Sequence, residues 1–397
     1  MLPLLLLLSC RDTITDTSAA DETGTAQVDD SGGAAPSDFA CTYVDPPDHG
    51  AVGTVAITVE VVAEGLFTPW GLAWMPDGDM LLTERDGVIS RVTPGGVVTQ
   101  LAVVPSIETG EGGLLGLALD PDFATSRAFY IYYTASDGGT VNRVARWSLS
   151  SDGTAAAEES IIVDDIPARQ YHNGGRLRIG PDERLYIGTG DAGDPDASQD
   201  IDSLAGKVLR VNRDGSIPDD NPVSGSATWL WGVRNTQGFD WLDDETMVIS
   251  DHGPSGLGNE GGRSDHDEVT VAVAGDNLGW PVVYACESGD GFTPAAITWG
   301  SAMPPGGLAV YTGTEIPDWS GDVLIGVLGF DDDTPHLHRL RLDDVGNVTR
   351  NEVYLHRDYG RLRETIMGPD GGLYVTTSNC DGRGTCGEGD RILRVGG

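Results

Sequence analysis

The sequence has few basic residues, with 24 Lys and Arg against 62 Asp and Glu, and its formal net charge is -38 over 397 residues. Nucleic-acid binding requires basic patches that neutralise phosphates, so this class of partner is excluded. An anionic membrane surface would also repel the chain. No stretch shows a sustained helical period of apolar residues, which argues against a helical fold. The acidic excess favours solubility, and acidic turns also offer the oxygen ligands that calcium prefers.

The chain begins with an apolar run, MLPLLLLLSC at residues 1–10, that is too short to span a bilayer. Its ending resembles a bacterial lipoprotein signal in which the cysteine is lipidated, although the usual positive charges before the run are missing. We therefore expect an exported protein, periplasmic or at the cell surface, that is anchored to the membrane through Cys10. Residues 11–40 hold almost no large apolar side chain, so they are predicted to form a disordered acidic linker.

Cysteine is scarce, and the five positions are Cys10, Cys41, Cys286, Cys380 and Cys386. With Cys10 assigned to the signal, four cysteines remain in an exported context, which predicts two disulfides. Cys380 and Cys386 would close a tight glycine-rich loop, and Cys41 with Cys286 would then hold the N-terminal segment against the body. Three pairings are formally possible, and the sequence does not choose among them.

Glycine and proline are abundant, with 56 and 22 residues, and they separate short apolar runs that are typical of strands and turns. One pattern recurs six times, as a Gly-Leu-like strand, a Pro-Asp-Gly-like turn and an apolar strand. The copies begin at Thr68, Gly112, Gly174, Asn235, Gly306 and Arg363. Hairpins that recur every ~45 to 75 residues are typical of propeller blades.

Residues 41–397 are therefore predicted to form an all-β, six-bladed β-propeller, with a pair of β-sandwiches as the alternative. A propeller must close its ring. We expect the C-terminal segment ILRVGG to pair with the early strand TVAITVEVV, which starts at Thr54, and to complete the last blade.

His172 stands just before one predicted strand and Asp191 at the end of the next, within the segment YHNGGRLRIGPDERLYIGTGDAG. A hairpin over this segment would bring the two side chains to one rim of the fold. A carboxylate beside an imidazole fixes its tautomer and stabilises its protonated form, so this pair is a candidate general base. A turn histidine bonded only to backbone is the competing interpretation.

Polar residues occupy the same place before the repeat strand in other copies, namely Arg234 with Asn235, and Arg361 with Arg363. Side chains alternate along a strand, so Arg361 and Arg363 would lie on one face. With Arg234 opposite, these guanidinium groups suit an anionic ligand that carries several carboxylates. The alternative is that they are surface arginines paired with the chain's many acids.

Two positions offer oxygen ligands to a hard cation. The turn that contains Gly253 and Pro254 would present backbone carbonyl groups, while Asp267 and Glu268 form an adjacent carboxylate pair. Solvated loop acids are the alternative for the second pair. Elsewhere, His336 and His338 alternate along a predicted strand and are expected on a solvated edge rather than in a metal site.

Nine blocks of sequence, in a fixed order, carry a resemblance to a known family. They are PWGLAWMPDG, GEGGLLGLALDPDF, HNGGRL, GTGDAGD, GKVLRVNRDGSIPDDNP, WGVRNTQG, HGP, DEVTVAVAGDNLGWP and GRLRETIMGPDG. Across residues 55–396 the chain resembles the bacterial aldose sugar dehydrogenases that use pyrroloquinoline quinone (PQQ), the family of soluble glucose dehydrogenase. The resemblance implies oxidation of an aldose sugar at its anomeric carbon to a lactone, with PQQ as hydride acceptor and calcium as a second cofactor. It also implies an electron acceptor, whose identity the sequence does not give.

The same resemblance implies a role for each candidate residue. His172 would be the catalytic base, Asp191 would orient it, and Arg234 would stabilise charge that develops on the quinone. The implied quinone contacts are Glu111, Arg234, Asn235, Arg361 and Arg363. The implied calcium ligands are Gly253 and Pro254 beside the quinone, and Asp267, Glu268 and Leu278 at a structural ion.

The chain departs from the family pattern at two positions. Glu111 replaces a cofactor-binding glutamine, which places a carboxylate near an anionic ligand unless it is protonated, faces the calcium or pairs with an arginine. A lysine of some members falls at or near Gly329, so one cation is missing. A non-catalytic calcium-binding propeller for adhesion or ligand capture is therefore the alternative function. A lactonase-type hydrolase is a third interpretation, which the arginines disfavour.

Overall fold

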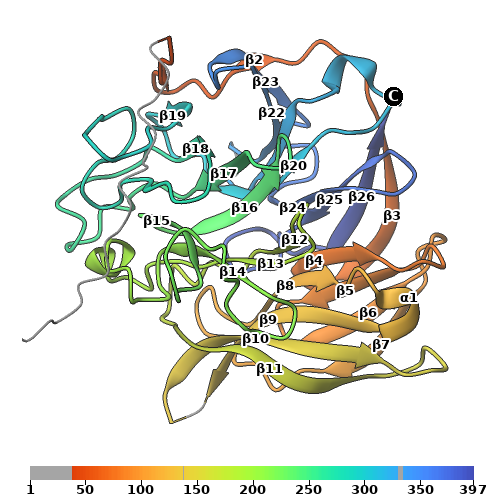
Figure 1. The fold of residues 1–397 in the computed structure, drawn as a ribbon. Helices are drawn as coiled ribbons and strands as arrows, with labels where there is room; N and C mark the ends of the chain where they lie inside the picture. Colours follow the sequence, from red (N-terminus) through yellow and green to blue (C-terminus); the bar gives the residue numbers. More distant parts are fainter. Residues whose placement is uncertain (1–37, 137, 330–333) are drawn as a thin grey trace, which may run out of the picture.

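Six sheets arranged in a ring, each built on four antiparallel strands, form the body of the protein, in a computed structural model that describes residues 38–136, 138–329 and 334–397 (Figure 1). Each predicted repeat forms the inner hairpin of one sheet. The six-bladed propeller is therefore confirmed, and the alternative of two β-sandwiches is wrong. Cys10 and the linker up to residue 37 lie outside the described residues. None of the described helices is long and apolar enough to cross a membrane.

The first three blades follow the chain in order. Blade 1 contains β4 (Pro69–Trp74), β5 (Met80–Glu84), β6 (Val88–Val92) and β7 (Val98–Val103). Blade 2 contains β8 (Leu114–Leu119), β9 (Ala128–Ser136), β10 (Thr140–Leu149) and β11 (Ala156–Pro167), with the short helix α1 (Phe123–Ser126) between β8 and β9. Blade 3 contains β12 (Leu177–Ile179), β13 (Leu185–Gly188), β14 (Lys207–Val211) and β15 (Thr228–Trp231).

The last three blades also use strands from the N-terminal segment. Blade 4 contains β16 (Thr236–Trp241), β17 (Met247–Asp251), β18 (Glu268–Ala272) and β19 (Ile297–Trp299). Blade 5 contains β20 (Pro305–Val310), β21 (Val323–Val327), β22 (His336–Leu342) and β23 (Val348–Tyr354). Blade 6 contains β24 (Leu362–Met367), β25 (Leu373–Thr377), β26 (Asp390–Gly396) and β3 (Thr58–Leu66).

The ring closes through blade 6, because β26 pairs antiparallel with β3 from the start of the chain. This pairing confirms the predicted closure. The segment before β3 then runs across two neighbouring blades. There β1 (Thr42–Val44) adds in parallel to β19, and β2 (Ala51–Val52) adds in parallel to β23.

Two disulfides hold the termini of the described chain. Cys41 pairs with Cys286 and fixes the N-terminal segment beside blade 4, while Cys380 pairs with Cys386 in the loop before β26. Of the three possible pairings, the structure therefore has the one that closes the short loop.

The apolar core lies between the blades. Six clusters of buried side chains, counted over the described residues, each fill one interface between two neighbouring sheets. Between blades 1 and 2, for example, Leu81 packs with Phe129. Burial of apolar surface therefore stabilises the ring rather than any single blade, which is why the repeat is needed in several copies.

Small residues on the innermost strands let neighbouring blades approach each other at the axis. A Cβ atom on Gly238 of β16 would lie 2.6 Å from the carbonyl oxygen of Gly306 in β20. A Cβ atom on Gly116 of β8 would lie 2.0 Å from the carbonyl oxygen of Gly175. These contacts are with backbone, which cannot rotate away, so the Gly-Leu pattern of the repeat reflects blade packing.

Gly238→Ala is expected to lower the free energy of unfolding by roughly 1–3 kcal/mol, because the added methyl group overpacks the contact between blades 4 and 5. Gly139→Ala is the matched control, since its new Cβ atom would meet nothing within 4 Å. Denaturant unfolding of both variants measures the difference. An unchanged midpoint for Gly238→Ala would show that the blades do not pack this closely.

His336 and His338 are buried, contrary to the expectation of a solvated edge. Their exposed fractions are 1% and 0%, and the imidazole nitrogens Nε2 of His336 and Nδ1 of His338 lie 2.9 Å apart. Distant segments cover both rings: His338 packs edge-on against Trp299 of blade 4, with ring centroids 5.0 Å apart, and the centroid of the His49 ring lies 5.8 Å from that of His336. Burial lowers the pKa of His338 to about 3, so this imidazole is neutral.

Candidate active site

Two adjoining hollows lie where loops meet around the inner strands. The first, of about 280 Å³, is the base hollow, and residues that characterise it are Tyr171, His172, Arg234, Gly253 and Pro254. The second, of about 270 Å³, is the arginine hollow, and residues that characterise it are Arg85, Gln237, Arg361, Arg363 and Asp381. Both hollows share five lining residues, which are Glu111, Tyr171, His252, Pro304 and Arg383. The two hollows are therefore neighbouring parts of one site.

The predicted pair of His172 and Asp191 is formed. His172 precedes β12 and Asp191 follows β13, and the imidazole Nδ1 lies 2.7 Å from the carboxylate Oδ1. Asp191 also accepts hydrogen bonds from the indole Nε1 of Trp280 at 2.9 Å and from the backbone N–H of Gly193 at 2.7 Å. With Nδ1 of His172 directed at this carboxylate, the hydrogen bond orients the ring so that Nε2 is the nitrogen left to accept a proton.

His172 is thus more than a turn histidine bonded to backbone. Its side chain is 6% exposed and lines the base hollow. Its backbone has φ 58°, an uncommon conformation for a residue with a side chain. An imidazole with an oriented Nε2 lone pair at the wall of a cavity can accept a proton from a bound hydroxyl group.

The second histidine of the base hollow serves a different purpose. His252 donates Nε2–H to the carbonyl oxygen of Pro305 at 2.6 Å. Burial lowers the pKa of His252 to about 3, so its ring stays neutral over the working range of most proteins. Of the two histidines that line this hollow, only His172 has a carboxylate partner.

Arg234 and Asn235 follow β15 and are held by Asp251 at the end of β17. The two carboxylate oxygens of Asp251 accept the backbone N–H groups of Arg234 at 2.7 Å and Asn235 at 2.6 Å. The Asn235 side-chain oxygen accepts the backbone N–H of Gly174 at 2.9 Å, which joins blade 4 to the loop of His172. Asn235 therefore connects the loop of His172 to Asp251 of blade 4.

The Arg234 guanidinium is 2% exposed and makes an ion pair with Glu260 at 2.6 Å. Glu260 also accepts the backbone N–H groups of Ser255 at 3.0 Å and Leu257 at 2.7 Å. This acid shapes the loop after Gly253 and Pro254 around the guanidinium, which lines the base hollow. Arg234 therefore presents a fixed positive charge near His172.

Arg361 and Arg363 lie side by side in the arginine hollow, as the alternation along their strand predicts. Both contact the same carboxylate oxygen of Asp381, at 2.9 Å for Arg361 and 3.3 Å for Arg363. These two cations lower the pKa of Asp381 to about 2 against the effect of its burial, so Asp381 is ionised. Arg361 also donates to the carbonyl oxygens of Leu328 at 2.9 Å and Gly329 at 2.7 Å. Its guanidinium thereby reaches the position of the missing lysine.

Glu111 pairs with an arginine, which is one of the three possibilities that its sequence position left open. One oxygen accepts the backbone N–H of His172 at 2.9 Å, and the other lies 3.3 Å from the Arg383 guanidinium. Burial opposes ionisation, but nearby positive charge and the His172 amide lower the pKa of Glu111 below its usual value. The glutamate is therefore charged and held at the boundary of the two hollows.

The candidate cation ligands fall into two groups. Gly253 and Pro254 line the base hollow, and within the described part of the chain no hydrogen bond reaches their carbonyl oxygens. The oxygens of Asp267, in contrast, accept the backbone N–H groups of Gly253 at 2.9 Å and Met303 at 2.6 Å. Burial raises the pKa of Asp267 to about 6 and that of Glu268 well above its usual value.

Leu278 donates its backbone N–H to Trp231 at the edge of blade 3, at 2.8 Å. Residues 38–136, 138–329 and 334–397 contain no group of three or more His, Cys, Asp or Glu side chains arranged to hold a metal ion. The carbonyl oxygens of Gly253 and Pro254 are donors of the kind that calcium accepts, and Asp267 accepts the backbone N–H of Gly253 in the same turn.

Several residues for which the sequence predicted no role in the site complete it, and one of them, Trp280, was expected only to pack between blades. They are Arg85, Trp280, Glu260, Asp381 and Arg383. Glu260, in the run GNEGG, carried no sequence signal. For Asp381 and Arg383 there was a partial signal in the sequence, because a disulfide between Cys380 and Cys386 would make the loop that contains them rigid.

A larger hollow, of about 760 Å³, lies between blades 2 and 3. Its charged lining includes Arg213, which pairs with Asp120 at 3.0 Å and Asp122 at 2.8 Å. These charges satisfy one another, and no histidine or cysteine lines this hollow.

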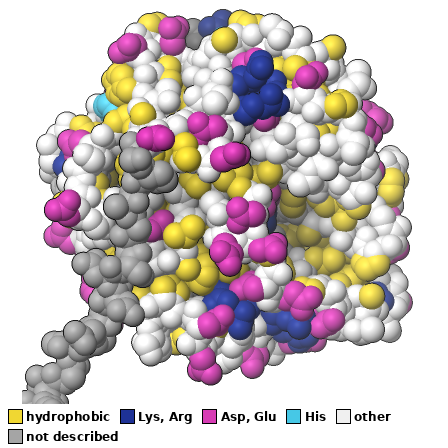
Figure 2. Space-filling model, turned by 45° about the horizontal axis from the view of Figure 1, so that its top comes forward, with side chains coloured by type: hydrophobic (Ala, Val, Ile, Leu, Met, Phe, Trp, Pro, Cys, Tyr) yellow, Lys and Arg dark blue, Asp and Glu magenta, His cyan; other side chains and the backbone are white. Residues whose placement is uncertain are grey.

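Acidic side chains are spread over much of the visible face, whereas Lys and Arg form separate clusters (Figure 2).

Comparison with known proteins identifies the family of the chain. Residues 66–393 match the family profile described as Glucose / Sorbosone dehydrogenase. The aldose sugar dehydrogenase YliI of Escherichia coli (strain K12) is 31% identical over 355 residues, which cover 82% of this chain and 91% of that protein. Quinoprotein glucose dehydrogenase B of Acinetobacter calcoaceticus is 31% identical over 293 residues, or 65% of this chain and 59% of that protein.

Among solved structures, the PQQ-bound form of aldose sugar dehydrogenase from Streptomyces coelicolor is 35% identical and superimposes with a TM-score of 0.76. The match covers 86% of this chain and 99% of that one. A family profile that spans most of the chain, together with relatives above 30% identity, establishes the relationship. The chain belongs to the glucose/sorbosone dehydrogenase family, the PQQ-dependent sugar dehydrogenases.

Proposed function

We propose that the protein is a quinoprotein that oxidises aldose sugars at the anomeric carbon to lactones, with PQQ as the hydride acceptor. One observation carries the proposal: His172, paired with Asp191, lines a hollow that adjoins a second one lined by Arg85, Arg361 and Arg363. A base beside a sugar-sized hollow and cations beside a neighbouring hollow are what this chemistry requires.

The residues present fit a planar tricarboxylate. Four guanidinium groups line the arginine hollow, from Arg85, Arg361, Arg363 and Arg383, against the carboxylates of Asp381 and Glu111. The lining is therefore cationic despite the acidic chain. Arg361 and Arg363 would hold carboxylates of the cofactor through charge-assisted hydrogen bonds. When bound, the quinone would supply the two-electron acceptor of the oxidation.

The chain's own residues would handle the proton. Nε2 of His172 would accept the proton of the anomeric hydroxyl group, and Asp191 would stabilise the imidazolium that forms. Arg234, fixed by Glu260, would place positive charge in the same hollow. These groups are held in place before the sugar binds, so little reorganisation accompanies the reaction.

We also propose that calcium binds at the carbonyl oxygens of Gly253 and Pro254. A chelator is then expected to weaken PQQ binding, because the site would lose a divalent charge beside the anionic ligand. Equilibrium titration followed by PQQ absorbance, with calcium and with chelator, measures this effect. Equal affinities in the two titrations would contradict the calcium proposal.

The two disulfides are consistent with export to an oxidising compartment, which we propose as the location.

The proposed function is tested by reconstituting the purified protein with PQQ and calcium and measuring dye reduction with a panel of aldoses. Activity is expected with at least one aldose and absent with its methyl glycoside, which lacks the free anomeric hydroxyl group. Binding of PQQ without turnover of any aldose would instead favour a ligand-capturing propeller.

A further inference from the structure

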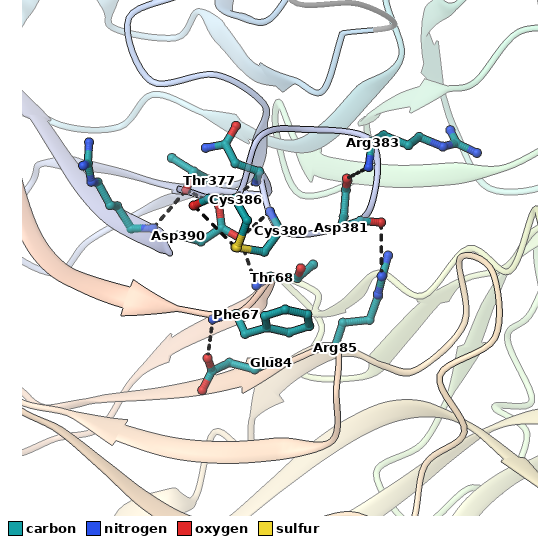
Figure 3. Close-up of a disulfide and its surroundings, with 12 residues drawn as sticks. Phe67, Thr68, Glu84, Arg85, Thr377, Cys380, Asp381, Arg383, Cys386 and Asp390 are labelled. Carbon is teal, nitrogen blue, oxygen red and sulfur yellow. Dashed lines mark hydrogen bonds between the residues drawn. A yellow bond between two sulfur atoms is a disulfide. The ribbon is translucent and has the colours of Figure 1, made fainter. Parts of the chain in front are cut away.

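The loop closed by Cys380 and Cys386 carries two charged residues into the arginine hollow. Only five residues separate the two cysteines, whose Cα atoms are 4.2 Å apart. Asp381 and Arg383 both line the hollow. Figure 3 shows the Arg383 side chain extending away from the disulfide, while Asp381 stays beside it.

The base of this loop is fixed by hydrogen bonds. Asp390 accepts the backbone N–H groups of Cys380 at 3.1 Å and Thr68 at 3.0 Å, which ties the loop to blade 1 (Figure 3). Arg85 donates to the carbonyl oxygen of Asp381 at 3.2 Å, and Asp381 accepts the backbone N–H of Arg383 at 3.0 Å. These bonds anchor the backbone up to Arg383, and the disulfide at Cys386 holds the part of the loop that follows it.

The charges of the loop are bound with different strength. Asp381 is 3% exposed and joins Arg361 to Arg363, so it is part of the fixed framework. Arg383 is 66% exposed, and its guanidinium pairs with Glu111 at 3.3 Å. An exposed ion pair of this kind contributes little to stability, so the guanidinium can change partner at low cost.

Glu111, in contrast, stays in place without Arg383, because it accepts the backbone N–H of His172. Both members of the pair line both hollows, so a ligand that extends from one hollow to the other must pass between or beside them. A carboxylate of such a ligand would compete with Glu111 for the one guanidinium here that is free to move.

We propose that Arg383 is a ligand-binding residue that transfers its guanidinium from Glu111 to a carboxylate of the bound quinone, and that the Cys380–Cys386 disulfide keeps it within reach. This inference rests on the proposed function. It assigns to Arg383 the cationic role that Gly329 cannot fill. It also makes Glu111 a competitor that the ligand displaces.

The experiment measures dissociation constants of PQQ for the full chain with calcium, by absorbance titration. Arg383→Gln is expected to weaken binding by about ten- to hundredfold, as for loss of a charge-assisted contact. Arg391→Gln is the matched control, because it removes the same charge from β26 outside both hollows and should bind as the wild type does. Arg383→Lys, which keeps the charge, should retain part of the affinity.

Combining Arg383→Gln with Glu111→Gln distinguishes an Arg383 that binds the ligand from an Arg383 that only neutralises the charge of Glu111. If Arg383 binds the ligand, Glu111→Gln tightens binding and Arg383→Gln still weakens it in the double variant. If Glu111→Gln fully restores the affinity of Arg383→Gln, Arg383 is only a countercharge and the inference is overturned. Equal affinities of the wild type, Arg383→Gln and Arg391→Gln would overturn it as well.

The disulfide is tested with the variants Cys380→Ser/Cys386→Ser and Cys41→Ser/Cys286→Ser. The first is expected to weaken PQQ binding about three- to tenfold, because the loop must then be ordered on binding. The second, distant pair should leave the dissociation constant unchanged although the fold is less stable. If both variants bound PQQ with the same dissociation constant, the Cys380–Cys386 disulfide would have no part in keeping Arg383 within reach of the ligand.

A parallel titration with trimesate, an aromatic tricarboxylate without redox chemistry, keeps the two proposals distinguishable. If the wild type binds trimesate but no PQQ, the proposed function fails and the Arg383 series with trimesate decides the inference. If the wild type binds neither anion, the inference is overturned too.

Discussion

His172→Gln is expected to lower kcat for aldose oxidation by about 10² to 10⁴, the usual contribution of a positioned base. The amide cannot accept the proton that Nε2 of His172 receives, while Glu111 and the arginines stay in place. The dissociation constant of PQQ should therefore change little. Steady-state dye reduction and the absorbance titration measure the two quantities on the same protein.

Asp191→Asn provides the companion test of this assignment. Asp191 accepts hydrogen bonds from three donors, on His172, Gly193 and Trp280, and an asparagine at this position would direct its own N–H₂ group at one of them. We expect a large loss of kcat with a smaller loss of stability. If His172→Gln retained wild-type kcat, another group would have to be the base.

Removing the carboxylate of Glu364 is expected to have the largest effect on stability. Glu364, on β24, is fully buried and forms ion pairs with Arg176 and Arg178 of blade 3. Arg176 is also fully buried, donates to the carbonyl oxygen of Gln237 at 2.7 Å, and stacks on Trp70 at 4.5 Å. This cluster joins blades 1, 3, 4 and 6 at the centre of the ring.

Glu364→Gln would leave the Arg176 charge buried without its counterion, which typically costs about 3–5 kcal/mol of folding free energy. Glu315→Gln is the matched control, because Glu315 is 36% exposed and pairs with Arg394 on the surface at 2.7 Å. That control should lose less than about 1 kcal/mol. Denaturant unfolding compares the two, and equal losses would contradict the central role of Glu364.

The propeller could be predicted from the sequence because each blade is specified by residues that lie close together in the chain. Each copy carries its own glycine, turn and apolar strand, and the turn fixes which residues pair. The closing strand was predictable for the same reason, since a ring that ends on β26 needs a partner and β3 has the alternating pattern. Local pattern also placed His172 and Asp191 at the two ends of one hairpin.

The rest of the site depends on contacts between distant segments. Glu111 finds Arg383 across 272 positions, and nothing near Glu111 in the sequence indicates that partner. Glu260 and Trp280 reach the site through loops whose paths are set by packing rather than by a repeat. His336 and His338 were predicted on a solvated edge, and this was wrong because Trp299 and His49, which cover them, belong to distant segments.

The central claim is most directly tested by a single turnover of the PQQ-loaded wild-type protein, mixed with an aldose in the absence of dye. The proposal predicts that the absorbance of bound PQQ changes to that of its reduced form, by one equivalent per site, and that His172→Gln slows this change by about 10² to 10⁴. A spectrum that stays oxidised in the wild type with every aldose would contradict the proposed function.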